Sequence, residues 1–210
     1  QGTAHTKFVW VTNCNHISYL TGCSTYSNTY TFLVTYRDDY CPAPALKIKT
    51  ITIKVLAKAI IKPPSVRCTK VEPNGDVTLS WAAPSDTDNT FESYHIYASN
   101  TKNGPYTKVD SLIKGGSIDI NTTSKLLVGA NANAAPVYYY MRSRSGCWGR
   151  IFSGNSDTIS TMKLTTTNIG NNQASLVWNA PHKPLLPTVI GNYKVYRKLN
   201  GVWSQIGTTS

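Results

Sequence analysis

Apolar and polar residues alternate along much of this 210-residue chain, which predicts β-strands that bury one face. Turn-forming pairs such as Asn74-Gly75 and Asn103-Gly104 separate the alternating stretches. Only residues 124–135 leave room for a helix, so a mixed α+β fold is the alternative to an all-β one. The alternating apolar sets are Tyr30, Phe32, Val34 and Tyr36; Ile51, Ile53 and Val55; Val77, Leu79 and Trp81; Tyr94, Ile96 and Ala98; and Val137, Tyr139 and Met141.

The first 60 residues predict three strands, at about 8–12, 30–37 and 47–56. Lys47 and Lys49 share the phase of Ile51, so we expect a β-bulge near Lys49 that changes the inward face. Three strands are too few for a closed sandwich. The segment is therefore predicted to belong to a larger immunoglobulin- or cadherin-like domain, with a small disulfide-stapled module as the alternative.

Three blocks of sequence recur in the same order, 97 to 99 residues further along the chain. A strand-rich repeat of about 100 residues has the size of one β-sandwich domain. The two-residue difference falls between blocks, where loops tolerate changes in length. The matched blocks are 79–84 with 176–181, 94–97 with 193–196, and 103–109 with 200–206.

The repeated blocks resemble the fibronectin type III family, whose pattern is a Trp ending the second strand, a Pro soon after, and a Tyr-x-Val-x-Tyr-like third strand. The third strands depart from the pattern at Ala98 and Arg197, where an aromatic residue is common. The resemblance also implies a corner tyrosine at the start of the sixth strand, and by phase Val137 stands there. The matching residues are Trp81, Pro84, Tyr94 and Ile96, and then Trp178, Pro181, Tyr193 and Val195.

The predicted fold class is therefore all-β, with tandem immunoglobulin-like or fibronectin type III sandwiches, one complete and two partial. The boundaries follow from the repeat and from the stiff Pro63-Pro64 junction. Residues 1–60 are expected to be the C-terminal part of one sandwich, 61–164 a complete module, and 165–210 the N-terminal part of another. On this interpretation the chain is an excerpt of a longer array.

The net charge of +11 is distributed unevenly. Residues 1–70 carry nine basic and two acidic groups, residues 71–164 carry eight of each, and residues 165–210 carry four basic groups and no acidic one. A neutral central module argues against nucleic-acid binding, which favours a continuous basic stripe. The lysines around the first junction either meet an anionic surface polysaccharide or protect strand edges. No apolar run is long enough to span a membrane, and the N-terminus does not resemble a signal peptide.

Five cysteines stand at positions 14, 23, 41, 68 and 147, without a Cys-x-x-Cys pair. In a sandwich, Cys68 on the first strand and Cys147 between the last two strands share a pole, so we predict a disulfide between them, with two free thiols as the alternative. Three pairings are open to the other cysteines, and we favour Cys14 with Cys41 because both fall at strand ends.

No catalytic constellation stands out, so we expect no enzyme activity, cofactor or metal centre. Nucleophile elbows, zinc-protease motifs and phosphate-binding glycine loops are not found in the sequence. Asp86-Thr87-Asp88-Asn89 offers oxygen ligands for calcium, but solvated turn aspartates explain it as well.

A set of aromatic and basic residues is the candidate binding surface. Trp148 sits in a turn, and its neighbours on the preceding strand alternate with the core positions. Such a set can stack on sugars, or it can cap the sandwich and pack on a neighbouring domain, which tandem modules require. The residues are Tyr138, Tyr140, Arg142, Arg144 and Trp148.

Short motifs give a closer resemblance, to repeats of giant surface proteins of gliding bacteria that are exported by type IX secretion. The motifs are Asp39-Tyr40-Cys41-Pro42-Ala43-Pro44 before an isoleucine-rich strand, Gly75-Asp76-Val77-Thr78-Leu79-Ser80-Trp81, Ser93-Tyr94-His95-Ile96-Tyr97, and Gly129-Ala130-Asn131-Ala132-Asn133-Ala134. The resemblance implies an extracellular adhesin or gliding-motility protein. It also implies O-glycosylation of Asp-Ser/Thr-apolar triplets, which here would modify Ser111 and Thr158.

The leading functional hypothesis is a non-catalytic structural or adhesive segment at the cell surface. Its partners would be neighbouring domains, a surface polysaccharide, or the secretion and motility machinery. The alternative is an accessory module, spacer or carbohydrate-binding, of a secreted polysaccharide-degrading enzyme. An animal receptor ectodomain is weaker, because the chain has no Trp-Ser-x-Trp-Ser element.

Overall fold

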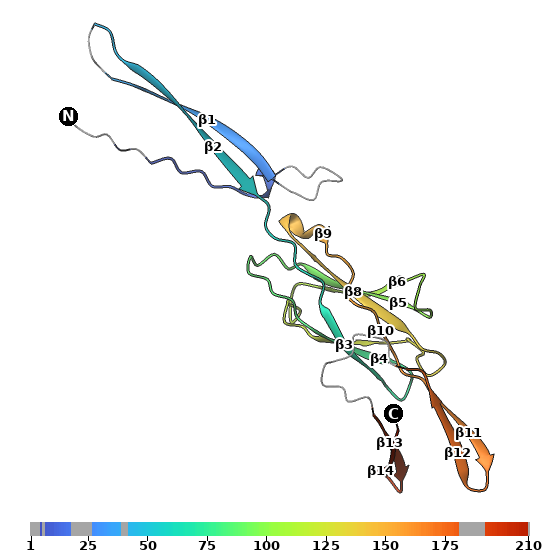
Figure 1. Ribbon diagram of the computed structural model, residues 1–210. Coiled ribbons are helices and arrows are strands. Elements are labelled where there is room, and N and C mark those ends of the chain that lie inside the picture. The colour runs from blue at the N-terminus through green and yellow to red at the C-terminus, as the bar shows by residue number, and fades with distance from the viewer. Residues whose placement is uncertain (1–4, 6, 18–26, 39–41, 181–191, 210) are drawn as a thin grey trace.

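The computed structural model describes residues 5, 7–17, 27–38, 42–180 and 192–209 of the chain. In these residues the protein is all-β, and every strand pair is antiparallel (Figure 1). A long N-terminal hairpin, a central sandwich and two short C-terminal hairpins follow one another along an elongated molecule (Figure 1). The strands are β1 (Ser27–Arg37), β2 (Leu46–Leu56), β3 (Ser65–Val71), β4 (Val77–Ala82), β5 (Ser93–Ser99), β6 (Thr107–Ile113), β7 (Ser124–Leu127), β8 (Tyr138–Ser145), β9 (Ile151–Phe152), β10 (Ile159–Ser160), β11 (Leu164–Gly170), β12 (Gln173–Trp178), β13 (Tyr193–Leu199) and β14 (Val202–Thr209).

The central module packs two sheets face to face. One sheet has the order β3-β4-β7 and the other β10-β8-β5-β6, with β9 paired to the end of β8. This arrangement agrees with the predicted immunoglobulin-like or fibronectin type III sandwich. Residues 124–135 form β7 and turns instead of a helix.

The core of the sandwich includes the alternating residues that the sequence pattern selected on β4, β5 and β8, together with residues from other strands and loops. Leu79, Trp81, Tyr94, Ile96 and Met141 are all buried. Their side chains point inward from β4, β5 and β8 because successive residues of a strand face opposite sides.

A tyrosine pins the connection between β6 and β7, but not from the position that the resemblance implied. The corner position is occupied by buried Val137, whose N–H donates to Thr161 Oγ1 at 2.8 Å. The Tyr94 hydroxyl instead donates to Ile120 O at 2.6 Å, and burial raises the pKa of Tyr94. The connection between β6 and β7 is therefore fixed by a hydrogen bond from Tyr94 on β5.

The two copies of the internal repeat share even the irregularities in their strand register. In the β5–β6 hairpin the register shifts after Ile96 and leaves Val109 without a partner, and the β13–β14 hairpin shifts after Val195 and leaves out Ile206. These residues correspond under the sequence repeat. Trp81 and Tyr94 meet edge to face at 5.6 Å, and Trp178 and Tyr193 do the same at 5.1 Å. The two copies therefore share local geometry as well as sequence.

The N-terminal segment covers one face of the β1–β2 hairpin. Trp10 meets Tyr30 and Phe32 with ring centroids 4.8 and 5.2 Å apart, and Phe8 lies 5.0 Å from Phe32. Residues 8–12 are not a strand, contrary to prediction; Phe8 and Trp10 pack on the hairpin through these ring contacts.

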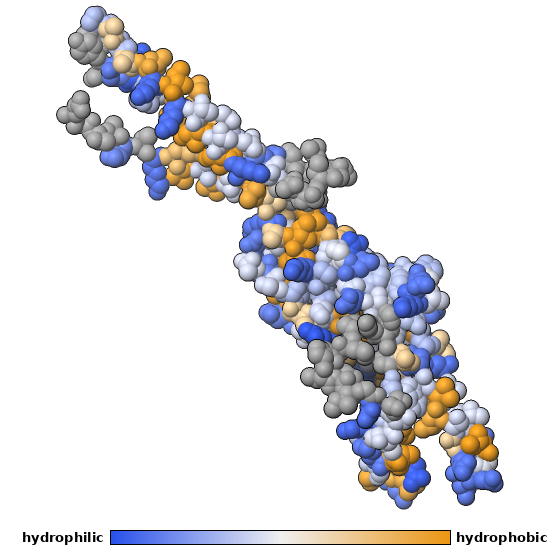
Figure 2. Space-filling model, viewed as in Figure 1, coloured by the Kyte–Doolittle hydropathy of each residue, from blue (hydrophilic) through white to orange (hydrophobic). Residues whose placement is uncertain are grey.

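The bulge predicted near Lys49 is also wrong, because β1 and β2 pair without interruption from Leu46 to Leu56. The change from apolar to charged residues along β2 instead marks the point beyond which the N-terminal segment no longer covers the strand. Val55 is buried and Ile53 half-buried beside the N-terminal segment, whereas Lys47 and Lys49 are exposed. The two hairpin ends of the molecule present more apolar surface than the sandwich, whose surface is mostly polar (Figure 2).

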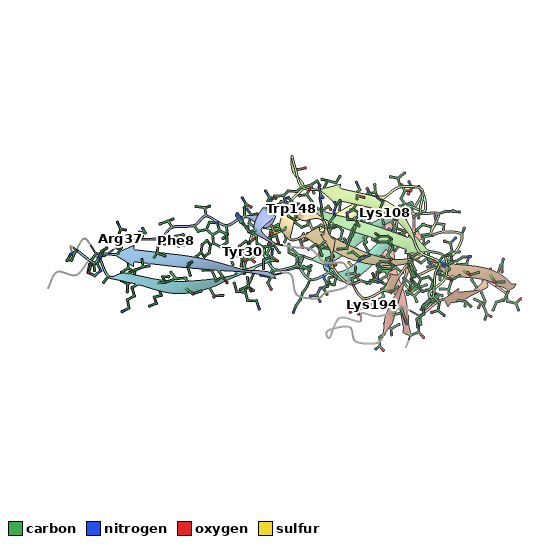
Figure 3. All side chains as sticks on the ribbon, turned by 90° about the horizontal axis from the view of Figure 1, so that it is seen from above. Phe8, Tyr30, Arg37, Lys108, Trp148 and Lys194 are labelled. Atoms are coloured by element: carbon green, nitrogen blue, oxygen red, sulfur yellow. A yellow bond between two sulfur atoms is a disulfide. The ribbon has the colours of Figure 1, made fainter. Side chains whose placement is uncertain are left out.

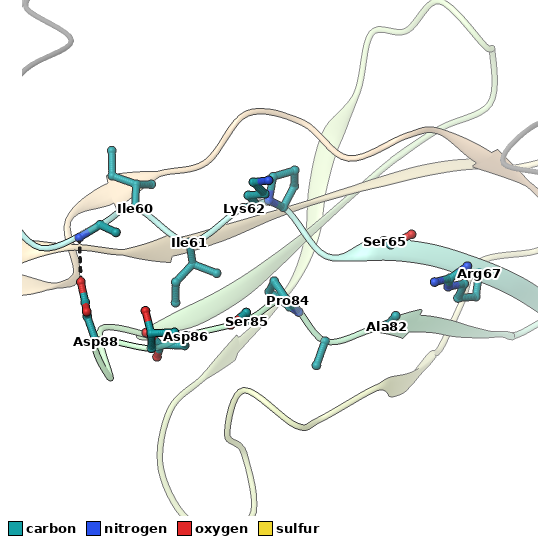
Figure 4. A pocket seen from close by; sticks show the side chains of 14 residues that line it. Ile60, Ile61, Lys62, Ser65, Arg67, Ala82, Pro84, Ser85, Asp86 and Asp88 are labelled. Carbon is teal, nitrogen blue, oxygen red and sulfur yellow. Dashed lines mark hydrogen bonds between the residues drawn. The ribbon is translucent and has the colours of Figure 1, made fainter.

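The linker between the hairpin and the sandwich is bonded to the sandwich along its length. Ala59 N–H donates to Asp88 Oδ2 at 3.1 Å (Figure 4), and Ile61 N–H donates to Ser145 Oγ at 2.9 Å. Buried Ser143 Oγ donates at 3.0 Å to the carbonyl oxygens of both Ile61 and Lys62. The segment before Pro63-Pro64 is therefore a fixed part of the module and not a flexible tether.

Candidate functional site

A disulfide closes the joint between the hairpin and the sandwich, but it joins Cys14 to Cys147. Both predicted pairs, Cys68 with Cys147 and Cys14 with Cys41, are therefore wrong; Cys41 lies outside the described residues. The Cα atoms are 5.5 Å apart, and the bridge spans 133 residues of sequence. Cys147, Ile17 and Val55 form a small buried cluster of their own, separate from the core of the sandwich.

A β-bulge explains why Cys68 has no disulfide partner. The β3–β4 register shifts between Val66 and Cys68, so Arg67 has no cross-strand partner on β4. Val66 is fully buried, and without the bulge Cys68 would share its inward face. The shift turns Cys68 outward, where it is exposed and free.

Cys147 reaches Cys14 because a tight turn, η2 (Cys147–Gly149), follows β8. Gly146 and Gly149 both have positive φ angles, +78° and +58°. A Cβ at Gly149 would lie 2.7 Å from Glu92 Cγ, so glycine is required there. Trp148 also takes a positive φ of +57° and is 49% exposed. Trp148 lies at the end of the sandwich that meets the N-terminal segment, and Lys108 lies at a distance from it (Figure 3).

Alternation along β8 divides the candidate binding residues from the core, as predicted. Tyr139, Met141 and Ser143 point inward and are buried, and the residues between them are half-buried on the outer face. Cross-strand partners on β5 and β6 extend this face. We call it the aromatic–basic face; its members are Tyr97, Tyr106, Lys108, Tyr138, Tyr140, Arg142, Arg144 and Phe152.

Three tyrosines form one end of the aromatic–basic face. Tyr97 and Tyr140 are direct cross-strand partners, and their rings stack at 4.8 Å with an interplanar angle of 12°. The ring of Tyr106 lies 4.9 Å from that of Tyr140, and its hydroxyl donates to Lys102 O at 2.7 Å. Burial raises the pKa values of Tyr106 and Tyr140, so both are neutral at physiological pH.

Two arginines and a phenylalanine form the other end. The guanidinium carbon of Arg142 lies 4.8 Å from the centroid of the Phe152 ring, and that of Arg144 lies 5.7 Å from it. Arg142 Nε also donates to Ser153 O at 2.9 Å. These contacts fix the orientation of the Arg142 head group by cation–π attraction and a hydrogen bond.

His95 lies beneath this end of the face. Strand alternation predicts it on the solvent side, but the Phe152 ring at 4.9 Å covers it, and only 7% of His95 is exposed. Desolvation lowers the pKa of His95 from its ordinary 6.5, and the charges of Lys108, Arg144 and Arg142 lower it further. Burial, reinforced by local positive charge, therefore favours the neutral imidazole of His95.

A pH-dependent stability follows from His95. Below about pH 6.5 the unfolded chain binds a proton at this residue that the folded chain resists, so the free energy of unfolding should fall as the pH drops from 7 to 5. His95→Gln should remove part of that slope in urea titrations at several pH values, whereas exposed His5→Gln should leave it unchanged. An unaltered slope in His95→Gln would contradict the assignment.

Sequence reasoning found the β8 members of the face but missed Tyr97, Tyr106, Lys108 and Phe152. Tyr97 and Lys108 lie within the repeated blocks, so a hairpin register drawn from the repeat would have placed them beside Tyr140. Phe152 reaches the face only because of the turn at Gly146–Gly149. The sequence pattern does not specify the geometry of that turn.

The two expected glycosylation positions border the same face. Ser111 lies on β6 with its Oγ 3.4 Å from His95 Nδ1, and Thr158 lies close enough to Tyr106 to influence the pKa of that tyrosine. Both residues are half-buried. A glycan on either would cover part of the aromatic–basic face.

The aspartates of the β4–β5 loop serve the fold. Asp86 accepts hydrogen bonds from the N–H groups of Thr90 and Phe91, both at 2.9 Å, and Asp88 holds the linker through Ala59. These bonds lower the pKa of Asp86 against the opposing effect of burial. Within the described ranges, no three His, Cys, Asp or Glu residues gather as a metal site would require.

A comparison with models of protein families finds no match to this chain, and a search of curated proteins finds no significant match either. Among the described residues there is no helix with the length and apolar character needed to cross a membrane.

Proposed function

We propose that this chain is a non-catalytic structural and adhesive segment of a larger cell-surface or secreted protein that acts in bacterial adhesion or gliding motility. The short motifs shared with surface proteins of gliding bacteria support this proposal, and they suggest export by type IX secretion. The disulfide supports an oxidising location outside the cytoplasm.

The observation that carries the proposal is the junction between the hairpin and the sandwich, which a disulfide and hydrogen bonds hold together. A binding segment held away from a cell needs modules that transmit force without folding back on one another. Here the Cys14–Cys147 bridge and the bonded linker through Ala59 and Ile61 join the hairpin to the sandwich at two places. Domain junctions are mobile by default unless the interface is extensive. A covalent and hydrogen-bonded junction therefore favours a stiff spacer.

The apolar faces of the flanking hairpins support a role within a longer array. Val177, Leu199, Val202 and Trp203 are each more than half exposed on the two C-terminal hairpins. Such surfaces favour association, so we propose that neighbouring domains of the same protein cover them. An accessory module of a polysaccharide-degrading enzyme is the second candidate, and the aromatic–basic face favours it.

The test is an in-frame deletion of these 210 residues from the parent gene, with surface display followed by an antibody to a retained part. We expect display to persist while attachment or gliding of the cells is lost. Unchanged attachment and motility, or a catalytic domain on the same protein whose polysaccharide turnover falls with the deletion, would favour the enzyme-associated alternative.

A further inference from the structure

We propose that the aromatic–basic face binds an acidic polysaccharide, a chain of sugar rings that carry carboxylate or sulfate groups. The inference rests on the extracellular adhesive role proposed above, and it adds the ligand class and the site.

The stacked tyrosines provide a platform for sugar rings. The pyranose ring presents C–H groups on its faces, and these pack against flat aromatic rings. Tyr97 and Tyr140 are nearly parallel, and the hydroxyl of Tyr106 is tied to Lys102 O and its ring lies against Tyr140. Side chains that are already held in place lose little conformational entropy when a ligand binds.

The cations provide partners for the acidic groups of the same ligand. Residues two apart on β8 face the same side about 7 Å from one another, so Tyr138, Tyr140, Arg142 and Arg144 form one row. Lys108 lies across β5 from this row, opposite Tyr97. An extended polysaccharide along β8 would therefore meet aromatic rings first and guanidinium groups next. Guanidinium groups bind carboxylate and sulfate oxygens through paired hydrogen bonds.

The charge of these cations is not neutralised by an ion pair within the described part of the chain. The ion pairs in the described part of the chain are Lys70 with Glu72 and Lys125 with Asp110, and neither involves Lys108, Arg142 or Arg144. The Nε of Arg144 is buried and has no hydrogen-bond partner among the described residues. The lowered pKa of His95 has the same three cations among its causes.

Three of the eight carboxylates that make the central module neutral are engaged outside this face. Glu72 is in the turn between β3 and β4, and Asp86 and Asp88 are in the loop between β4 and β5, where they hold backbone groups. The module thus has no net charge but a cationic outer sheet face. Three cations are fewer than a nucleic-acid strand needs for a continuous contact, and an aromatic platform beside them suits a charged sugar chain better.

Affinity electrophoresis of the 210-residue chain tests this inference, with polygalacturonate, dextran sulfate or neutral dextran in the gel. We expect retardation by an acidic polysaccharide and none by dextran. The double variants Tyr97→Ala/Tyr140→Ala and Arg142→Gln/Arg144→Gln should each weaken binding roughly tenfold or more, because the first removes the stacking platform and the second removes the charge-assisted hydrogen bonds. Circular dichroism and thermal unfolding would confirm that each variant remains folded.

Matched controls separate this face from the general basicity of the chain. Tyr196→Ala/Arg197→Gln changes an exposed tyrosine and arginine on β13, and Lys47→Gln/Lys49→Gln/Lys54→Gln removes charge from β2. Both variants should bind like the unmodified chain. A preference for polygalacturonate assigns the ligand to the carboxylated class, and a preference for dextran sulfate assigns it to the sulfated class.

Three results would overturn the inference: no retardation by either acidic polysaccharide, equal retardation of the face variants and the unmodified chain, or equally tight binding to a single-stranded DNA oligonucleotide. Each would leave the spacer role intact, because that role is judged separately by the attachment of cells that carry the in-frame deletion.

Discussion

Replacing Cys14 and Cys147 together by alanine should lower the free energy of unfolding by up to about 5 kcal/mol. A bridge that closes a loop of 133 residues restricts the unfolded chain strongly, and the chain-entropy relation gives a value of that size. The variant also loses a covalent tie between two modules, so the N-terminal segment should separate from the sandwich before the sandwich unfolds. Urea unfolding followed by circular dichroism measures the first effect.

Limited proteolysis measures the second effect. Trypsin should cut after Lys58 faster in the double variant, because the linker is then held by non-covalent contacts alone. Cys68→Ser is the matched control, since Cys68 is exposed and free, and neither measurement should change. Alkylation without reduction should label Cys68 and leave the peptides of Cys14 and Cys147 linked. A double variant as stable and as resistant to trypsin as the unmodified chain would rule out the joint described here.

Trp81→Ala should destabilise the sandwich by about 3–5 kcal/mol, the range for truncating a large aromatic side chain in a packed core. Trp81 is only 3% exposed, comes from the central strand of the smaller sheet and meets Tyr94 of the other sheet edge to face. Its removal leaves a cavity between the sheets that the surrounding strands cannot close without breaking register. Differential scanning calorimetry should show the transition of the sandwich at a clearly lower temperature.

Trp203→Ala provides the comparison for this prediction. Trp203 is 64% exposed on β14, so its truncation should change stability by no more than about 0.5 kcal/mol. If the two tryptophan variants melted together, the core assignment of Trp81 would be wrong. The pair therefore tests whether the sandwich or the terminal hairpin carries the cooperative stability.

The inward faces of β4, β5 and β8 could be predicted because that information is local. Val77, Leu79 and Trp81 alternate with polar residues, and the pleat of a strand converts this order directly into inside and outside. The same rule separated Tyr140 and Arg142 from Tyr139 and Met141 on β8. The repeat likewise placed Trp178 and Tyr193 in the same contact as Trp81 and Tyr94.

The sequence by itself thus determined the all-β class, the shared local geometry of the repeated blocks and the outward row of tyrosines and arginines on β8. Only the tertiary structure decided which cysteines pair, what covers His95 and where the inward face of β2 ends. A bulge at Arg67 turned Cys68 outward, the turn at Gly146–Gly149 carried Cys147 to Cys14 and Phe152 to His95, and the N-terminal segment covered Val55 but not Lys49. Each of these outcomes depends on the distance between residues far apart in sequence. A local alternation of apolar and polar residues carries no information about that distance.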